Sequence, residues 1–250
     1  MFKSALVFSV ALFALLVSPV TRAESGSFQV AQHGHAVGTA SFNFTPAASG
    51  YTSTSIVRVA MQGLDYSLSK TETLTSANRL RHAQLSAVVN NSAVTVVATP
   101  DSAQLLLNTS ANGRSTTTRL TAHTAAVFLP DFDPGALETL LALAVTQSGR
   151  DLWAIIPKQA GSIEPVRLAT YADEKGTLAG KPITVHHLVA TIAGADTHLF
   201  SGPENQLLQA ELPEAGFALV RNGFVLTPPA KAPAPPVQPT NPQATPPPSN

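Results

Sequence analysis

Residues 64–74 read LDYSLSKTETL, and this stretch shows most clearly what kind of fold the chain forms. Leu64, Tyr66 and Leu68 alternate with polar residues. Successive side chains of a β-strand point to opposite faces, so this alternation places the three apolar side chains on one face. The stretch therefore predicts a strand with one buried and one solvated face, as in an antiparallel sheet.

The same two-residue period recurs on both sides of this stretch. The strongest turn signals between the runs are residues 90–92 (NNS) and 112–113 (NG), because Asn and Gly adopt the positive φ of tight hairpins. Short turns favour an antiparallel meander, since a parallel pair requires a long crossover. The predicted strands cover residues 27–32, 36–44, 51–61, 64–74, 80–89, 93–99, 105–110, 115–122, 151–156, 165–172, 183–192, 197–200, 206–212, 217–220 and 224–226, with a turn at 173–176.

One apolar helix interrupts the strands. Asp133 suits the N-cap and Pro134 the first helical position, and residues 135–147 then read GALETLLALAVTQ. Apolar side chains cover nearly the whole circumference of this segment, which indicates a buried helix. We therefore expect a mainly β fold, in which a single antiparallel curved sheet or half-barrel encloses the helix at 135–147.

The first 23 residues have the layout of a secretory signal peptide. Lys3 precedes an apolar run over residues 5–17, and residues 21–23 (TRA) supply small residues at the cleavage positions. The run is shorter than the roughly 20 residues that a bilayer span requires. We expect cleavage after Ala23 and a soluble chain, periplasmic or secreted, with a β domain over residues 24–226 and no integral membrane segment.

The last 24 residues, TPPAKAPAPPVQPTNPQATPPPSN (227–250), carry half of the 20 prolines. Proline removes a backbone donor and fixes φ, so this segment forms neither helix nor sheet. We predict a disordered, polyproline-II-like tail. It is either a solvated tail without a partner, or a spacer or docking strip for an envelope protein or the cell wall.

Composition excludes several classes of function. Without Lys3 and Arg22, 13 basic residues face 15 acidic ones, a formal net charge of −2. Nucleic-acid binding depends on neutralising phosphates, so we expect no nucleic-acid partner. The chain has no cysteine, which removes disulfides, thiol nucleophiles and a thiol for lipid attachment.

A strand meander, one apolar helix and further strands behind a signal peptide resemble the lipoprotein-carrier-like half-barrels of bacterial envelopes and related exported β families. The portions that carry this resemblance of layout are residues 28–44, 130–144 (PDFDPGALETLLALA) and 206–226 (QLLQAELPEAGFALVRNGFVL). The resemblance implies that the concave face holds an acyl chain or another apolar ligand, with the helix and loops as plug or lid. The missing cysteine fits only the soluble members.

From this resemblance we expect the chain to bind an apolar or amphipathic envelope component, such as a lipid, on the concave face and helix. The same side chains can equally form a filled core, and the sequence does not separate the two cases. The residues expected to line the site are Phe42, Phe44, Phe128, Phe132, Leu137, Leu140, Leu141 and Trp153.

No local enzyme signature is present: G-x-S-x-G, HExxH, the P-loop and GxGxxG are all missing. We therefore expect a non-catalytic protein. His33 and His35 lack a third metal ligand, and Asp131 and Asp133 lack a calcium loop, so we expect no metal and no cofactor. Two alternatives stay open: an envelope interaction protein acting through sheet edges or the tail, and a hydrolase whose site comes from distant residues. The hydrolase requires a histidine beside a serine or carboxylate, from among His33, His35, His82, His123, His186, His187 and His198.

Overall fold

The structure is a computed structural model that describes residues 24–146, 151–158 and 161–228. The predicted signal peptide over residues 1–23 lies outside the described residues, as does the predicted tail from residue 229 onward. The elements are β1 Ser25–Gln32, β2 His35–Ala47, β3 Gly50–Met61, β4 Leu64–Thr75, β5 Leu80–Val89, β6 Ser92–Asp101, β7 Gln104–Ala111, β8 Arg114–Thr121, β9 Ala125–Phe128, α1 Pro134–Thr146, β10 Leu152–Ile156, β11 Ser162–Thr170, β12 Glu174–Leu178, β13 Lys181–Ile192, β14 Ala195–Ser201, β15 Leu207–Leu212, the 3₁₀ helix η1 Pro213–Ala215, β16 Phe217–Arg221 and β17 Phe224–Leu226.

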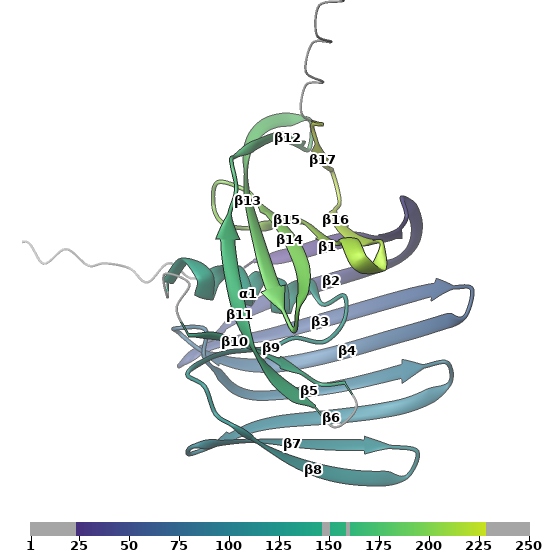
Figure 1. Cartoon of the computed structure of the whole chain (residues 1–250), viewed down its shortest axis with the longest axis vertical. Helices are drawn as coiled ribbons and strands as arrows, with labels where there is room; N and C mark the ends of the chain where they lie inside the picture. The colour runs from purple at the N-terminus through teal and green to yellow at the C-terminus, as the bar shows by residue number, and fades with distance from the viewer. Residues whose placement is uncertain (1–23, 147–150, 159–160, 229–250) are drawn as a thin grey trace, which may run out of the picture.

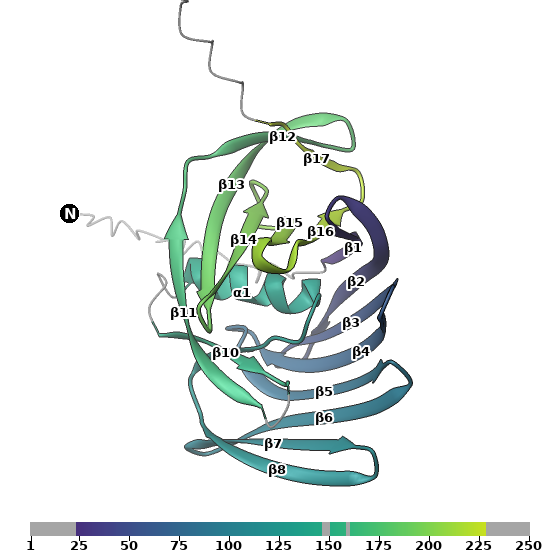
Figure 2. The same ribbon diagram turned by 45° about the vertical axis from the view of Figure 1, so that its right-hand side comes forward.

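The seventeen strands of the described residues form one curved, open sheet. Strands β1 to β8 pair consecutively as antiparallel hairpins, and β11, β13, β14, β15 and β16 form a second antiparallel run. Pairing of β16 with β1 joins the two runs. Figures 1 and 2 show α1 inside the curve of this sheet, with β10 and β11 crossing in front of β5 and β6. The predicted mainly β fold around one helix is confirmed.

One pair of strands departs from the antiparallel pattern. β9 and β10 are parallel, with Ala126 opposite Trp153 and Phe128 opposite Ile155. α1 lies between them in the chain and supplies the long crossover that a parallel pair requires. All four residues of β9 are buried, so its sequence AAVF has no polar alternation. That is why the period-two pattern did not reveal this strand.

The turn predicted at residues 173–176 is wrong. Strand β12 begins at Glu174 and pairs with both β13 and β17. A Cβ at Gly176 would lie 2.9 Å from the Phe224 ring and 2.9 Å from the Val225 carbonyl oxygen. Gly176 pairs with β13 on one side and β17 on the other, and this leaves no room for a side chain. This tertiary pairing overrides the turn preference of glycine.

The helix begins as predicted. Asp133 Oδ1 accepts hydrogen bonds from the backbone N–H groups of Gly135 (2.9 Å) and Ala136 (3.2 Å), which makes Asp133 the N-cap. Pro134 is the first helical residue. Leu140 and Leu143 are fully buried, and the helix packs on β2, β3, β9 and β15. The helix is therefore the centre of the core, and the sheet wraps around it.

We expect Leu140→Ala to lower the free energy of unfolding by about 2–5 kcal/mol, because it removes buried methyl groups and leaves a cavity. Val145 lies on the same helix but is 60% exposed, so Val145→Ala should change stability by no more than about 0.5 kcal/mol. Urea unfolding of both variants measures the difference. Equal losses would contradict the burial of the Leu140 face.

Candidate functional site

The structure places most of the predicted ligand-lining residues in one filled core. Phe42 and Phe44 on β2 stack edge to face, with ring centroids 5.5 Å apart. Phe128, Leu137, Leu140 and Leu141 are buried in the same cluster. These side chains contact one another and the sheet, so the part of the concave face under α1 is occupied by the helix. Their predicted contact with a ligand stays a prediction.

The other two predicted residues lie at separate edges of this core. Phe132 is half-buried between the rings of Tyr66 (6.1 Å between centroids) and Phe217 (4.7 Å). Trp153 is also half-buried and stacks on His123, with ring centroids 3.7 Å apart. Both side chains pack against the same hydrophobic cluster as the other six, and contact of the eight residues with a ligand stays a prediction.

A buried ionic cluster, which the sequence analysis did not predict, lies beneath the start of α1. Lys70 Nζ is 2.7 Å from Asp133 Oδ2 and 3.0 Å from Glu72 Oε2. The side chains of all three residues are fully buried. The side chains of Lys70 and Glu72 lie on the same buried face of β4 as those of Tyr66 and Leu68. The two-residue period could have revealed them, because it assigns two charged side chains to the buried face.

Two serines on β3 lie beside this ionic cluster. Ser53 lies opposite Glu72 and Ser55 opposite Lys70 in the β3–β4 pairing. Both hydroxyls and Glu72 Oε1 are buried and have no hydrogen-bond partner among the described residues. A Cβ at Gly135 would lie 2.6 Å from Ser55 Oγ. Because Gly135 has no side chain, the first turn of α1 can pack directly against Ser55 and the ionic cluster.

Burial dominates the electrostatics of this cluster. Burial raises the pKa of Glu72, against the opposing effect of Lys70. Burial alone would lower the pKa of Lys70, but the carboxylates of Asp133 and Glu72 outweigh it and the pKa of Lys70 is raised. The carboxylates of Asp133 and Glu72 therefore keep the Lys70 ammonium in its charged form.

A pocket of about 220 Å³ opens on the concave face beside this cluster. We call it the β5–β6 pocket. Its mouth carries an exposed ion pair, in which Lys158 Nζ lies 2.8 Å from Asp131 Oδ1 with 61% and 42% of the two side chains exposed. The lining residues are Tyr66, Leu85, Ala87, Val89, Val94, Val96, Pro130, Asp131, Pro157 and Lys158.

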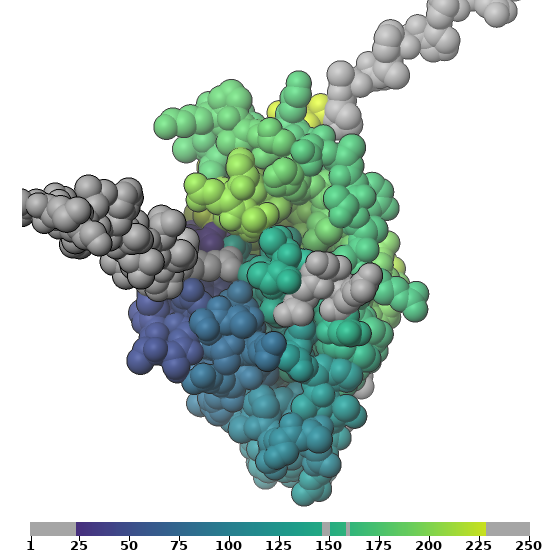
Figure 3. All heavy atoms as spheres, turned by 90° about the vertical axis from the view of Figure 1, so that its left-hand side faces the viewer, coloured from purple at the N-terminus to yellow at the C-terminus, as the bar shows by residue number. Residues whose placement is uncertain are grey.

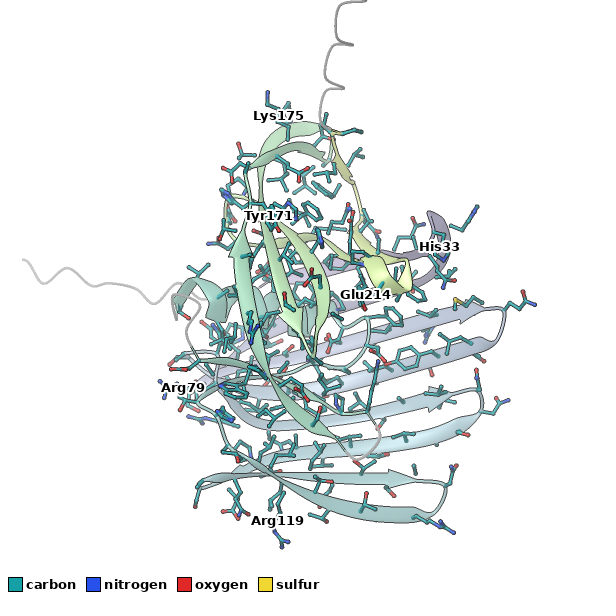
Figure 4. The ribbon with its side chains drawn as sticks, viewed as in Figure 1. His33, Arg79, Arg119, Tyr171, Lys175 and Glu214 are labelled. Atoms are coloured by element: carbon teal, nitrogen blue, oxygen red, sulfur yellow. The ribbon has the colours of Figure 1, made fainter. Side chains whose placement is uncertain are left out.

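A second pocket, of about 230 Å³, lies toward the opposite ends of the same strands, where Arg79 and His123 line it. Figure 4 shows Arg79 at the end of the meander remote from the β5–β6 turn. Ala83 and Ala98 are paired between the two pockets and fully buried. A third pocket, of about 370 Å³, adjoins the C-terminal half of α1. In Figure 3 this teal part of the chain lies between the blue meander and the green later strands.

A histidine cluster lies beside Tyr171, which Figure 4 labels, and its residues line none of these pockets. His187 Nδ1 is 3.2 Å from Glu174 Oε1, and its Nε2 is 3.1 Å from His198 Nδ1. The rings of Tyr171 and Phe200 stack on His187. Both ring nitrogens of His187 are thus engaged by Glu174 and His198, and neither of these contacts involves a hydroxyl nucleophile.

Searches against protein-family models, curated proteins and solved structures find no match for this chain. Among the described residues, no group of three or more His, Asp or Glu side chains is arranged to hold a metal ion. The described part of the chain also contains no helix with the length and hydrophobicity that a bilayer crossing requires. The function of the site is therefore inferred from the chemistry of its residues alone.

We expect Lys70→Met to lower the free energy of unfolding by about 3–5 kcal/mol, because two carboxyl groups then stay buried without their cation. Lys158→Met is the matched control, since it breaks an exposed pair worth about 0–1 kcal/mol. Urea unfolding measures both losses. Similar losses for the two variants would contradict the burial of the Lys70 cluster.

The His187 cluster predicts a pH dependence of stability. Burial lowers the pKa of His187 below its ordinary value of 6.5; Glu174 and Glu211 oppose this effect and His198 adds to it. Below pH 6.5 the unfolded chain binds the proton more readily than the folded chain, so stability falls as the pH drops toward the folded pKa. His187→Gln should reduce this slope in urea midpoints measured against pH, and His35→Gln, at an exposed position, should leave it unchanged. If His187→Gln left the slope unchanged, this would contradict the attribution of the pH dependence to His187.

Proposed function

We propose that this chain is an exported, non-catalytic protein that binds the apolar part of an amphipathic ligand in the β5–β6 pocket. The observation that carries the proposal is the pairing of apolar walls with a charged mouth in one cavity on the concave face. Each methylene group transferred from water to such walls contributes about 0.8 kcal/mol. The resemblance to lipoprotein-carrier-like half-barrels supports the same class of ligand.

The size of the pocket limits the ligand. Its volume of about 220 Å³ is below the range of roughly 300–1,000 Å³ that is usual for pockets enclosing whole drug-sized ligands. It suits a segment of one acyl chain rather than a complete lipid. Because α1 fills the centre of the concave face, the helix acts as the plug in this proposal, and the ligand lies beside it.

The charged mouth suits the polar end of the ligand. Lys158 and Asp131 are both exposed, and an exposed ion pair contributes only about 0–1 kcal/mol. Exchanging this pair for a headgroup contact therefore costs little. An anionic headgroup is favoured at Lys158, while Asp131 restricts the approach of a second negative charge.

The alternative functions have weaker support. The Glu174–His187–His198 contacts place histidines beside a carboxylate, as a hydrolase requires, but none of these three residues lines the pockets described above. An interaction role for the Pro-rich tail concerns residues outside the described ranges. Both alternatives stay open as hypotheses.

Dodecanoate binding, measured by isothermal titration calorimetry, tests the proposal. Ala87 lines the pocket and Val88 points to the opposite face of β5. Ala87→Phe should weaken binding at least tenfold, equivalent to about 1.4 kcal/mol, because the ring occupies the space of the acyl chain. Val88→Phe adds comparable bulk outside the pocket and should bind like the unaltered chain. Equal affinities for the two variants, or no saturable binding by the unaltered chain, would refute the proposal.

A further inference from the structure

The Lys70 cluster brings together the groups that amide formation requires. We propose that Lys70 and Asp133 condense into an intramolecular amide bond between Nζ and Cγ, with Glu72 carrying the proton. Lys70 Nζ lies 2.7 Å from Asp133 Oδ2 and 3.0 Å from Glu72 Oε2. The amine therefore already contacts both the carboxyl group to be attacked and the proton carrier.

Exclusion of water favours the reaction. All three side chains are fully buried, and the surrounding core includes Phe42 and Phe44. Keeping the Lys70 ammonium and the Asp133 carboxylate in such surroundings carries a large desolvation cost, whereas the amide that replaces them is neutral and the water formed can leave to solvent. The reactive forms are the neutral amine and the neutral carboxylic acid, and transfer of one proton from Lys70 Nζ to Asp133 Oδ2 within the ion pair generates both.

The N-terminus of α1 supplies the stabilisation of the developing negative charge. Asp133 Oδ1 accepts hydrogen bonds from the N–H groups of Gly135 and Ala136. When an amine attacks Asp133 Cγ, negative charge develops on this same oxygen. Two backbone donors already aimed at it, at the positive end of the helix dipole, form the arrangement of an oxyanion hole. Glu72 lacks this arrangement, which singles out Asp133 as the carboxyl group attacked.

The step balances without any further reagent. The Lys70 ammonium gives one proton to Asp133 Oδ2, which leaves an amine and a carboxylic acid. The Nζ lone pair forms a bond to Cγ while the C=O electron pair moves onto Oδ1. Glu72 takes a proton from Nζ and delivers it to the Oδ2 hydroxyl, and the Cγ–Oδ2 bond breaks to release water as C=Oδ1 re-forms. Glu72 ends in its initial state, and nothing is oxidised or reduced.

The bond would join the middle of β4 to the residue that caps α1. It closes the chain across residues 70–133 and fixes the helix in the sheet, as a disulfide does in other exported domains. The chain has no cysteine, so this would be its covalent cross-link. The raised pKa of Glu72 is compatible with a group that both accepts and returns a proton.

Mass spectrometry of the purified full chain tests the proposal. The intact mass should be lower than that of the uncross-linked chain by one water, about 18 Da. Trypsin should fail to cleave after Lys70, and residues 59–79 should appear joined to residues 120–150. Lys70→Arg provides the uncross-linked reference. An unreduced mass with free peptides 59–70 and 71–79 would overturn the proposal.

A second variant tests the role of Glu72. Glu72→Gln should leave most of the chain uncross-linked, because the amide cannot carry the proton, while the intact Lys70 and Asp133 keep the reacting pair. Full cross-linking in Glu72→Gln would remove Glu72 from the mechanism. A water loss confined to residues 59–79, as a Lys70–Glu72 bond would produce, would overturn the assignment to Asp133. If Glu72→Gln fails to fold, the unaltered chain alone decides whether the bond forms.

Discussion

The structure depends on one carboxylate that serves two partners. Asp133 Oδ1 caps the first turn of α1, and its Oδ2 lies against the buried Lys70 ammonium of β4. The cap satisfies the free N–H groups that every helix start leaves, and the ion pair fixes that start on the sheet. Gly135 makes the contact possible, because any side chain there would collide with Ser55. The helix is therefore held at one defined position in the concave face.

That position determines where a ligand can bind. With α1 in place, the apolar residues under it are packed against one another, and the remaining space lies beside the helix. The β5–β6 pocket is the best candidate among these spaces, because its walls are apolar and its mouth carries exposed charges of both signs. The position of the helix and the location of the pocket beside it thus follow from the same anchoring contact.

Some of the signals that determine this fold act between neighbouring residues, and others depend on tertiary pairing. Strands with one solvated face, such as β4 and β5, were predicted to within one residue, since alternation is a property of neighbouring residues. β9 was missed because it is buried on both faces and shows no alternation. The turn predicted at 173–176 was wrong because pairing of β12 with β13 and β17 outweighs the turn preference of its residues. None of the eight predicted site residues belongs to the Lys70 cluster, and Asp133 was predicted only as the cap of the helix.

The sequence by itself determined the mainly β architecture, the start and burial of the helix, and the absence of disulfides. These follow from periodicity, capping chemistry and composition, which act over a few residues. Only the tertiary structure decided that Lys70, Glu72 and Asp133 meet in a site buried from solvent, and that the concave face is filled under α1 but open beside it. Contacts between residues more than sixty positions apart depend on how the whole sheet curves, and no local pattern encodes that curvature.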